Sequence, residues 1–101
     1  MFMKKGLPDH ERCKWIAALF KTLSNPRRLF MLCCLCEQDC TVSDLGKVCG
    51  ASQPVISQHL SRMRLEGLVD SRRDGNFVYY RIADPQIPTL IRSLERIFSP
   101  K

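Results

Sequence analysis

The chain has 101 residues, the size of a single domain, with 45% apolar and 26% charged residues. These proportions exclude an intrinsically disordered chain and predict a folded core. No apolar run approaches the roughly 20 residues of a membrane-spanning helix, and the first residues lack the apolar stretch of a signal peptide. We therefore expect a cytoplasmic protein with no membrane partner, whose six cysteines are reduced thiols and not a disulfide framework.

The charge balance favours a polyanionic partner. Sixteen basic residues against ten acidic ones give a net charge of +6. Cations that neutralise phosphates release condensed counterions, which stabilises binding to nucleic acid. A chain this short buries only part of its surface, so a second subunit is one way to complete its core.

The first half of the chain predicts two helices in one domain. We expect residues 1–10 to be a flexible lead-in and residues 11–101 to form the domain. Helical spacing over 11–24 places apolar side chains on one face, at Ile16, Leu19, Phe20 and Leu23. Asn25-Pro26 ends this pattern, and a second helix follows to about Glu37 with Ser24 or Asn25 as its N-cap.

The middle of the chain predicts a helix-turn-helix. A short extended piece over 40–42 leads to a helix over 44–48, with Ser43 as its N-cap. Gly50 supplies the turn, and Ser52 caps a second helix that reaches residue 66 with a proline in its first turn. Gly67 then ends this helix in a left-handed C-cap.

The last third switches from a period of 3.6 to a period of two. Residues 69–73 and 77–82 are predicted to form a β-hairpin whose tip is Asp74-Gly75-Asn76. After Pro85 a final helix carries one apolar stripe, formed by Ile87, Leu90, Ile91, Leu94, Ile97 and Phe98. This stripe fits either a dimer face or packing within one subunit. The whole order predicts a mainly helical winged helix-turn-helix.

The second helix of the helix-turn-helix has two contrasting faces. Val55, Ile56, Leu60 and Met63 face the bundle, and the other face offers Gln53, Ser57, Gln58, Ser61 and Arg62. Such side chains can hydrogen-bond to base edges in a major groove, although they are equally typical of an ordinary solvent-exposed helix face. Arg72 and Arg73 precede the hairpin tip, where cations reach phosphates or the minor groove.

Three motifs in this order resemble the ArsR/SmtB family of bacterial repressors. They are residues 23–29, residues 52–69 and residues 73–82, and the resemblance extends from about Ile16 to Phe98. It implies a homodimer that joins through its first and last helices, binds a near-palindromic double-stranded operator and is released by an effector. The expected interface residues are Ile16, Leu19, Phe20, Leu90, Ile91, Leu94, Ile97 and Phe98.

The expected DNA-binding residues lie in the recognition helix and the hairpin. They are Ser52, Gln53, Ser57, Gln58, His59, Arg62, Arg64, Arg72, Arg73 and Gly75. Among them, we expect Gln53, Ser57, Gln58 and Arg62 to reach bases and the remaining arginines to contact the backbone or to place the hairpin. Arg64 has a second interpretation as an internal ion-pair residue, because Glu66 and Asp70 are close in sequence.

The metal sites of related repressors are not expected here, and no cofactor is predicted. Thr41 and Ser43 stand where the resemblance would place two metal-binding thiolates, and hydroxyls are poor ligands for soft ions. Residues 84–101 contain neither His nor Cys, so the zinc or nickel site of other members is also missing. The C-x-x-C spacing of Cys33 and Cys36 lies in a helical apolar run without a second pair.

Cys33 resembles the sensing cysteine of those family members that respond to persulfides or oxidants. Ser99 stands where the partner thiol would be, so a switch would need Cys13 or Cys36 as the second thiol. Arg27, Arg28 and helix N-termini would supply the positive field that a reactive thiolate needs. The alternative is that the cysteines are small buried hydrophobic residues.

Three function classes follow from these patterns. The first is a homodimeric DNA-binding regulator, with a thiol-reactive effector sensed through Cys33 as one version. The second is a thiol oxidoreductase built on the cysteine-rich helix, although no catalytic dyad or phosphate-binding loop is legible. The third is a winged-helix module that binds proteins and not DNA. The sequence names neither the operator nor the effector, and it does not separate repression from activation.

Overall fold

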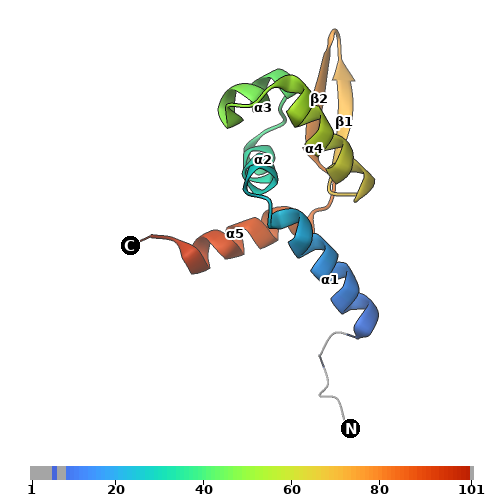
Figure 1. The fold of residues 1–101 in the computed structure, drawn as a ribbon, viewed down its shortest axis with the longest axis vertical. Coiled ribbons are helices and arrows are strands. Elements are labelled where there is room, and N and C mark those ends of the chain that lie inside the picture. Colours follow the sequence, from blue (N-terminus) through green and yellow to red (C-terminus); the bar gives the residue numbers. More distant parts are fainter. Residues whose placement is uncertain (1–5, 7–8, 101) are drawn as a thin grey trace.

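A computed structural model of the chain describes residue 6 and residues 9–100 (Figure 1). The described elements follow in the order α1 (His10–Leu23), α2 (Pro26–Glu37), α3 (Val42–Cys49), α4 (Gln53–Leu65), β1 (Val69–Asp74), β2 (Phe77–Ile82) and α5 (Gln86–Phe98). The predicted mainly helical winged helix-turn-helix is confirmed. Most of the predicted lead-in over 1–10 lies outside the described residues.

Local side-chain chemistry starts and stops the helices. At α2 the Asn25 side chain accepts hydrogen bonds from the backbone N–H groups of Arg27 and Arg28, so Asn25 and not Ser24 is the N-cap. At α4 the Ser52 hydroxyl accepts from the Val55 N–H, as predicted. Gly50 adopts a φ of 65° after α3, a left-handed conformation that favours glycine.

The N-cap of α3 differs from the prediction. Thr41, and not Ser43, caps this helix: its hydroxyl accepts from the Asp44 N–H, and the Asp44 carboxylate accepts from the Thr41 N–H, each at 3.0 Å. This reciprocal pair is a capping box, which satisfies two otherwise unpaired donors at once. The helix therefore begins at Val42, two residues earlier than expected.

One core joins the helix-turn-helix to α2 and α5. Its buried apolar side chains come from every helix and from β1: Leu23, Met31, Leu32, Leu35, Cys40, Leu45, Ile56, Leu60, Met63, Leu68, Val69, Ile87 and Ile91. Ile91 was predicted at the dimer interface, and this is wrong, because only 4% of its surface is exposed within a single subunit. The α5 stripe is thus divided, with Ile87 and Ile91 in the core and Ile97 and Phe98 exposed at 67% and 77%.

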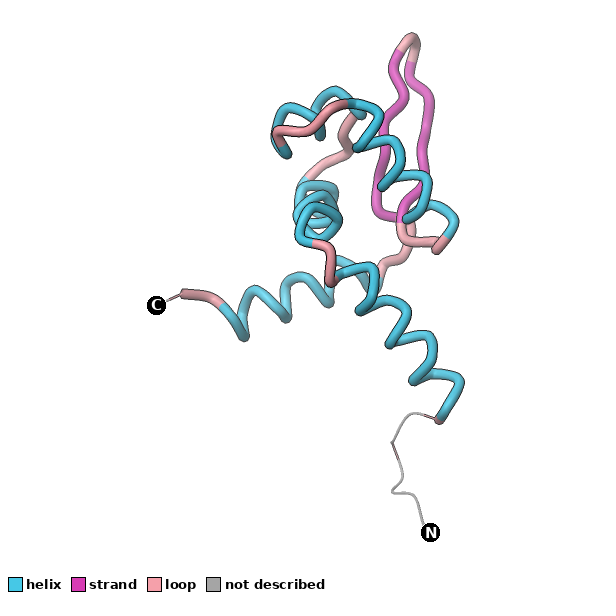
Figure 2. The backbone as a smooth tube through the Cα atoms, in the orientation of Figure 1, coloured by secondary structure: helices cyan, strands magenta, loops and turns pink. Residues whose placement is uncertain are grey.

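The wing is an antiparallel hairpin attached to the body at its base. Its register runs from the Val69–Ile82 pair to the Asp74–Phe77 pair at the tip. Cys40 and Tyr80 exchange two backbone hydrogen bonds of 3.1 and 2.7 Å, which fix β2 beside the segment that enters α3. The hairpin projects from the body of the domain. Helices α1 and α5 extend away from that body in different directions as two arms (Figure 2).

The capping box gives a test of the α3 boundary. We expect Thr41→Ala to lower the free energy of unfolding by about 1 kcal/mol, because the Asp44 N–H loses its acceptor. The matched change Ser43→Ala lies inside the helix and should alter stability by less than about 0.5 kcal/mol. Urea unfolding followed by circular dichroism measures both, and equal losses for the two variants would contradict the assignment of Thr41.

Candidate nucleic-acid interface

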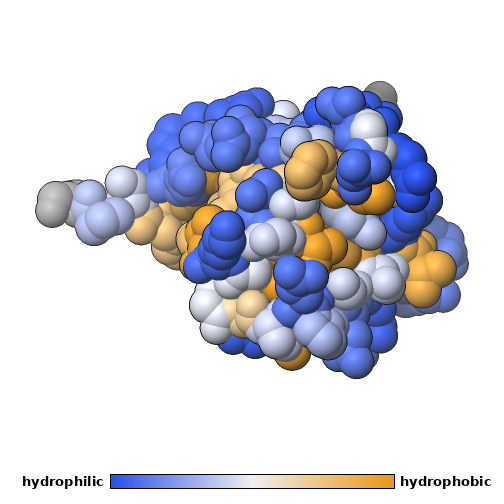
Figure 3. Space-filling model, turned by 90° about the horizontal axis from the view of Figure 1, so that it is seen from above, coloured by the Kyte–Doolittle hydropathy of each residue, from blue (hydrophilic) through white to orange (hydrophobic). Residues whose placement is uncertain are grey.

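Helix α4 presents a polar face because its apolar stripe is locked into the core. Ile56, Leu60 and Met63 are fully buried, and Val55 is half-buried. The residues predicted to read bases, Gln53, Ser57, Gln58 and Arg62, are all exposed on the rest of the helix, together with Ser61. The end of the molecule that carries α3, α4 and the wing tip shows mostly hydrophilic side chains around smaller apolar areas (Figure 3). The structure thus offers a polar helix for insertion into a groove.

The flank of α4 that faces α2 is fixed by a side-chain hydrogen bond. Arg28 Nε donates to His59 Nδ1 at 3.2 Å. Burial lowers the pKa of His59, and the positive charges of Arg28 and Arg27 lower it further. A neutral imidazole that accepts at Nδ1 carries its proton on Nε2. His59, one of the expected DNA-binding residues, is half-buried, and its Nδ1 faces Arg28 of α2.

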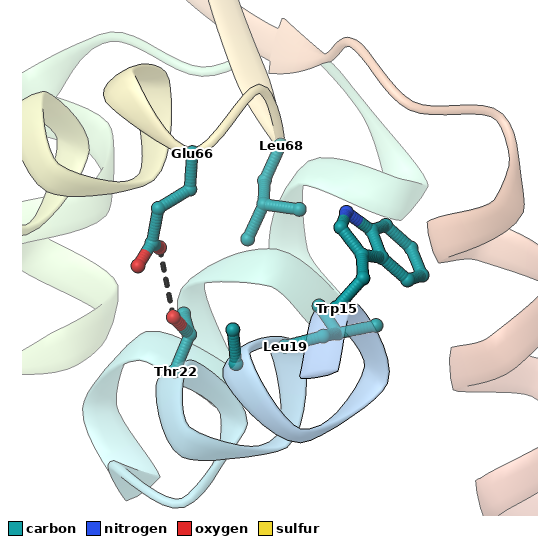
Figure 4. A pocket seen from close by; sticks show the side chains of 6 residues that line it. Trp15, Leu19, Thr22, Glu66 and Leu68 are labelled. Atoms are coloured by element: carbon teal, nitrogen blue, oxygen red, sulfur yellow. Dashed lines mark hydrogen bonds between the residues drawn. The ribbon is translucent and has the colours of Figure 1, made fainter. Parts of the chain in front are cut away.

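The end of α4 is fixed by a second long-range contact. Thr22 Oγ1 donates to Glu66 Oε1 at 2.8 Å, and Thr22 is only 1% exposed (Figure 4). Beside this bond lies a hollow of about 200 Å³ between α1 and the start of the wing, lined by Trp15, Ala18, Leu19, Thr22, Glu66 and Leu68. A buried hydroxyl needs its partner, so this bond ties the last turn of α1 to the C-cap of the recognition helix.

The two wing arginines have different surroundings. Arg72 Nε donates to Asp39 at 3.1 Å, and its guanidinium lies 4.8 Å from the centre of the Tyr79 ring. Arg72 also lies 3.8 Å from Asp74. Arg73 is exposed and makes no ion pair within residues 9–100. Of the two, Arg73 is the freer cation beside the tip at Gly75, whose φ is 63°.

The second interpretation of Arg64 is wrong for the described residues. Glu66 pairs with Arg62 at 3.6 Å, and Asp70 pairs with Arg81 at 2.7 Å. Arg64 is exposed and has no acidic partner within the described range. It thus remains a candidate for backbone contact.

Four of the remaining predicted interface residues lie between the two arms. A hollow of about 530 Å³ separates α1 from α5, and Ile16, Leu19, Phe20 and Leu90 line it. Leu94 is half-buried, and Phe20, Ile97 and Phe98 are exposed. Apolar side chains gathered on an open surface mark an interaction site.

The cysteines of α2 face α5. Cys33, Cys34 and Cys36 line a hollow of about 300 Å³ together with Arg92 and Glu95. Cys13 lies apart on α1 and is exposed. Burial raises the pKa of Cys33, and the Glu95 carboxylate raises it further. Burial also raises the pKa of Cys36, with a further rise from Cys33.

The expected activation by Arg27 and Arg28 does not appear in these thiols, because neither arginine lowers the pKa of Cys33, Cys34 or Cys36. Arg27 lowers the pKa of only one thiol among those shifted, Cys49, and burial outweighs it there. Within residues 9–100 no three His, Cys, Asp or Glu side chains gather as a metal site. No helix in the described part is long and apolar enough to cross a membrane.

Comparison with known proteins places this geometry among bacterial regulators. A model of the bacterial regulatory protein arsR family matches residues 25–71. The chain is 40% identical to the HTH-type transcriptional regulator YgaV of Escherichia coli over 85 residues. This alignment covers 83% of this chain and 86% of YgaV.

Two solved structures share the fold. The transcriptional repressor BigR from Xylella fastidiosa superposes with a TM-score of 0.83 at 35% identity, over 90% of this chain and 93% of BigR. The homodimeric winged helix-turn-helix DNA-binding domain Mb0332 from Mycobacterium bovis gives a TM-score of 0.77 at 28% identity, over 93% and 89% of the two chains. The chain therefore belongs to the arsR family of bacterial regulatory proteins.

Proposed function

We propose that the protein binds double-stranded operator DNA as a homodimer, with α4 in the major groove and the wing against the backbone. The observation that carries this proposal is the division of α4 into a fully buried apolar stripe and an exposed polar face. A net charge of +6 and the exposed Arg73 on the hairpin add the attraction that phosphates provide.

The proposed dimer forms through α1 and α5. Phe20, Ile97 and Phe98 leave apolar surface open in the single subunit, and burying such surface stabilises association. The homodimeric state of the similar Mb0332 domain supports the same arrangement. Ile91 takes no part in this interface because it already belongs to the core.

We further propose repression in the bacterial cytoplasm, where operator DNA is found, and no enzymatic activity. Likeness to the repressor BigR supports repression, and the family of bacterial regulatory proteins supports a regulator over a thiol oxidoreductase. The alternative is that the protein activates transcription by displacing another regulator. Deletion of its gene then lowers target transcription, whereas under repression deletion raises it.

The DNA-binding proposal is tested with a duplex from upstream of the protein's own gene. We expect Arg73→Ala to lower the slope of log K against log salt by about 0.9 per half-site, because one phosphate contact is lost. Gln58→Ala should instead reduce the preference for operator over scrambled duplex, because a base contact costs about 1–3 kcal/mol of discrimination. Fluorescence anisotropy at several salt concentrations measures both quantities.

Arg72→Ala is the matched comparison for the wing. Its guanidinium is already held by Asp39 and Tyr79, so its removal should change the slope less than removal of Arg73. If neither wing variant alters the slope, the wing does not contact the backbone. If the unaltered protein ignores every duplex, the protein-binding module becomes the better interpretation.

We also propose that Cys33 senses a thiol-reactive effector, with Cys36 or Cys13 as the second thiol. Cys33 and Cys36 line one hollow against α5, so modification there would disturb the packing of an arm of the proposed dimer. Disulfide formation removes two electrons and two protons from the thiol pair, and a polysulfide accepts them as it is reduced to hydrosulfide. A bridge across one helical turn is strained, so it would unwind part of α2.

Thiol sensing predicts a reversible loss of DNA binding. Polysulfide should weaken duplex binding of the unaltered protein, and a reductant should restore it, whereas Cys33→Ser should bind DNA and ignore polysulfide. Because burial raises the pKa of Cys33, its alkylation should be slow at neutral pH. The alkylation rate should keep rising at pH values where an ordinary thiol is already fully ionised. Cys49→Ser is the control, and full response of Cys33→Ser would contradict the assignment.

A further inference from the structure

Basic side chains from three helices gather on the flank of α4 that faces α1 and α2. A hollow of about 400 Å³ lies where the end of α1, the start of α2 and the side of α4 meet, and Lys21, Arg28 and Arg62 line it. Arg27 stands next to Arg28 in the first turn of α2 and is exposed. We call these four residues the flank cluster.

Helical geometry places the flank cluster at one side of the polar face of α4. At 3.6 residues per turn, His59 and Arg62 lie on one side of the helix, and Ser57 and Arg64 lie on the other. The hydrogen bond from Arg28 to His59 sets the first turn of α2 against the His59 side. Lys21, Arg27 and Arg28 therefore border the proposed base-reading surface from outside the helix-turn-helix, and Arg62 meets them from α4.

The flank cluster has too few acidic partners to balance its charge. Lys21 and Arg27 make no ion pair within the part of the chain that the structure describes. Arg28 donates its Nε–H to neutral His59, so this contact does not neutralise the guanidinium charge and leaves the terminal N–H groups as donors. Glu66 is the acidic side chain in the hollow, 3.6 Å from Arg62, and it is hydrogen-bonded to Thr22 as well. Gathered like charges repel, and an anion relieves this repulsion.

A helix inserted in the major groove has a sugar–phosphate backbone along each side, and phosphate contacts from both sides fix its register. We propose that Lys21, Arg27 and Arg28 bind the DNA backbone along the α2 flank of the recognition helix, beside Arg62. This inference rests on the proposed function and adds to it a phosphate-binding surface formed by α1 and α2. The wing and the flank cluster then hold the duplex at separate places.

The test is the double variant Lys21→Gln with Arg27→Gln, which leaves the Arg28–His59 bond and Arg62 in place. The matched control is Lys14→Gln with Arg96→Gln, which removes the same charge from α1 and α5 outside the cluster. Binding to operator and scrambled duplexes is measured by anisotropy over a range of salt concentrations. Each lost phosphate contact should lower the salt slope by about 0.9, and a dimer carries every contact twice.

We expect the flank variant to lose about three to four units of salt slope and to weaken binding to both duplexes by a similar factor. The operator-to-scrambled ratio should stay unchanged, and the control should keep most of the slope. Ethylation interference should show phosphates that matter for the unaltered protein and not for the flank variant.

Two results would overturn the inference. If the unaltered protein binds DNA and the flank variant has the same slope as the control, the flank cluster does not touch the backbone, and the proposed function survives. If the unaltered protein binds no duplex, the proposed function fails and the backbone surface fails with it. Thermal unfolding of each variant shows whether a weaker complex reflects a misfolded protein.

Discussion

Burial of one stripe of α4 is the constraint on which the rest of the structure depends. Ile56, Leu60 and Met63 leave no surface exposed, so the helix cannot rotate about its axis without bringing polar groups into the core. Because side-chain direction follows helical geometry, fixing this stripe also fixes the direction of Gln58 and Ser61. A hydrophobic contact thereby determines which polar groups are presented to a partner.

Contacts between distant segments refine this placement and connect the arms to α4. Arg28 meets His59 at the side of α4, and Thr22 meets Glu66 at its end. The second bond lies beside a hollow, and it joins buried Thr22 of α1 to the C-cap of α4 (Figure 4). A shift of α1 within the proposed dimer would change the geometry of this bond. The fold thus contains a short physical route between the arms and the recognition helix.

The sequence predicts what local chemistry determines. Asn-Pro at α2, Ser52 at α4 and the glycines after α3 and α4 mark boundaries, because caps and left-handed turns depend on neighbouring residues. The α3 boundary was misplaced because Thr41 and Ser43 are both cap-forming residues, and only the spacing from Thr41 to Asp44 separates them. The pairs Arg28–His59, Thr22–Glu66 and Arg72–Asp39 join residues more than thirty positions apart, and no periodicity reveals them.

For the cysteines, tertiary packing determines the thiol pKa, and the nearness of basic residues in sequence predicts the wrong direction of the shift. Arg27 and Arg28 precede Cys33 by about one and a half turns, yet Arg28 contacts His59 of α4, while the thiols of α2 face Glu95 of α5. Burial and that carboxylate raise the pKa of Cys33, which lowers its fraction of reactive thiolate. Displacement of α5 would remove both influences together. The reactivity of Cys33 is therefore physically linked to the position of the arm that the proposed dimer uses.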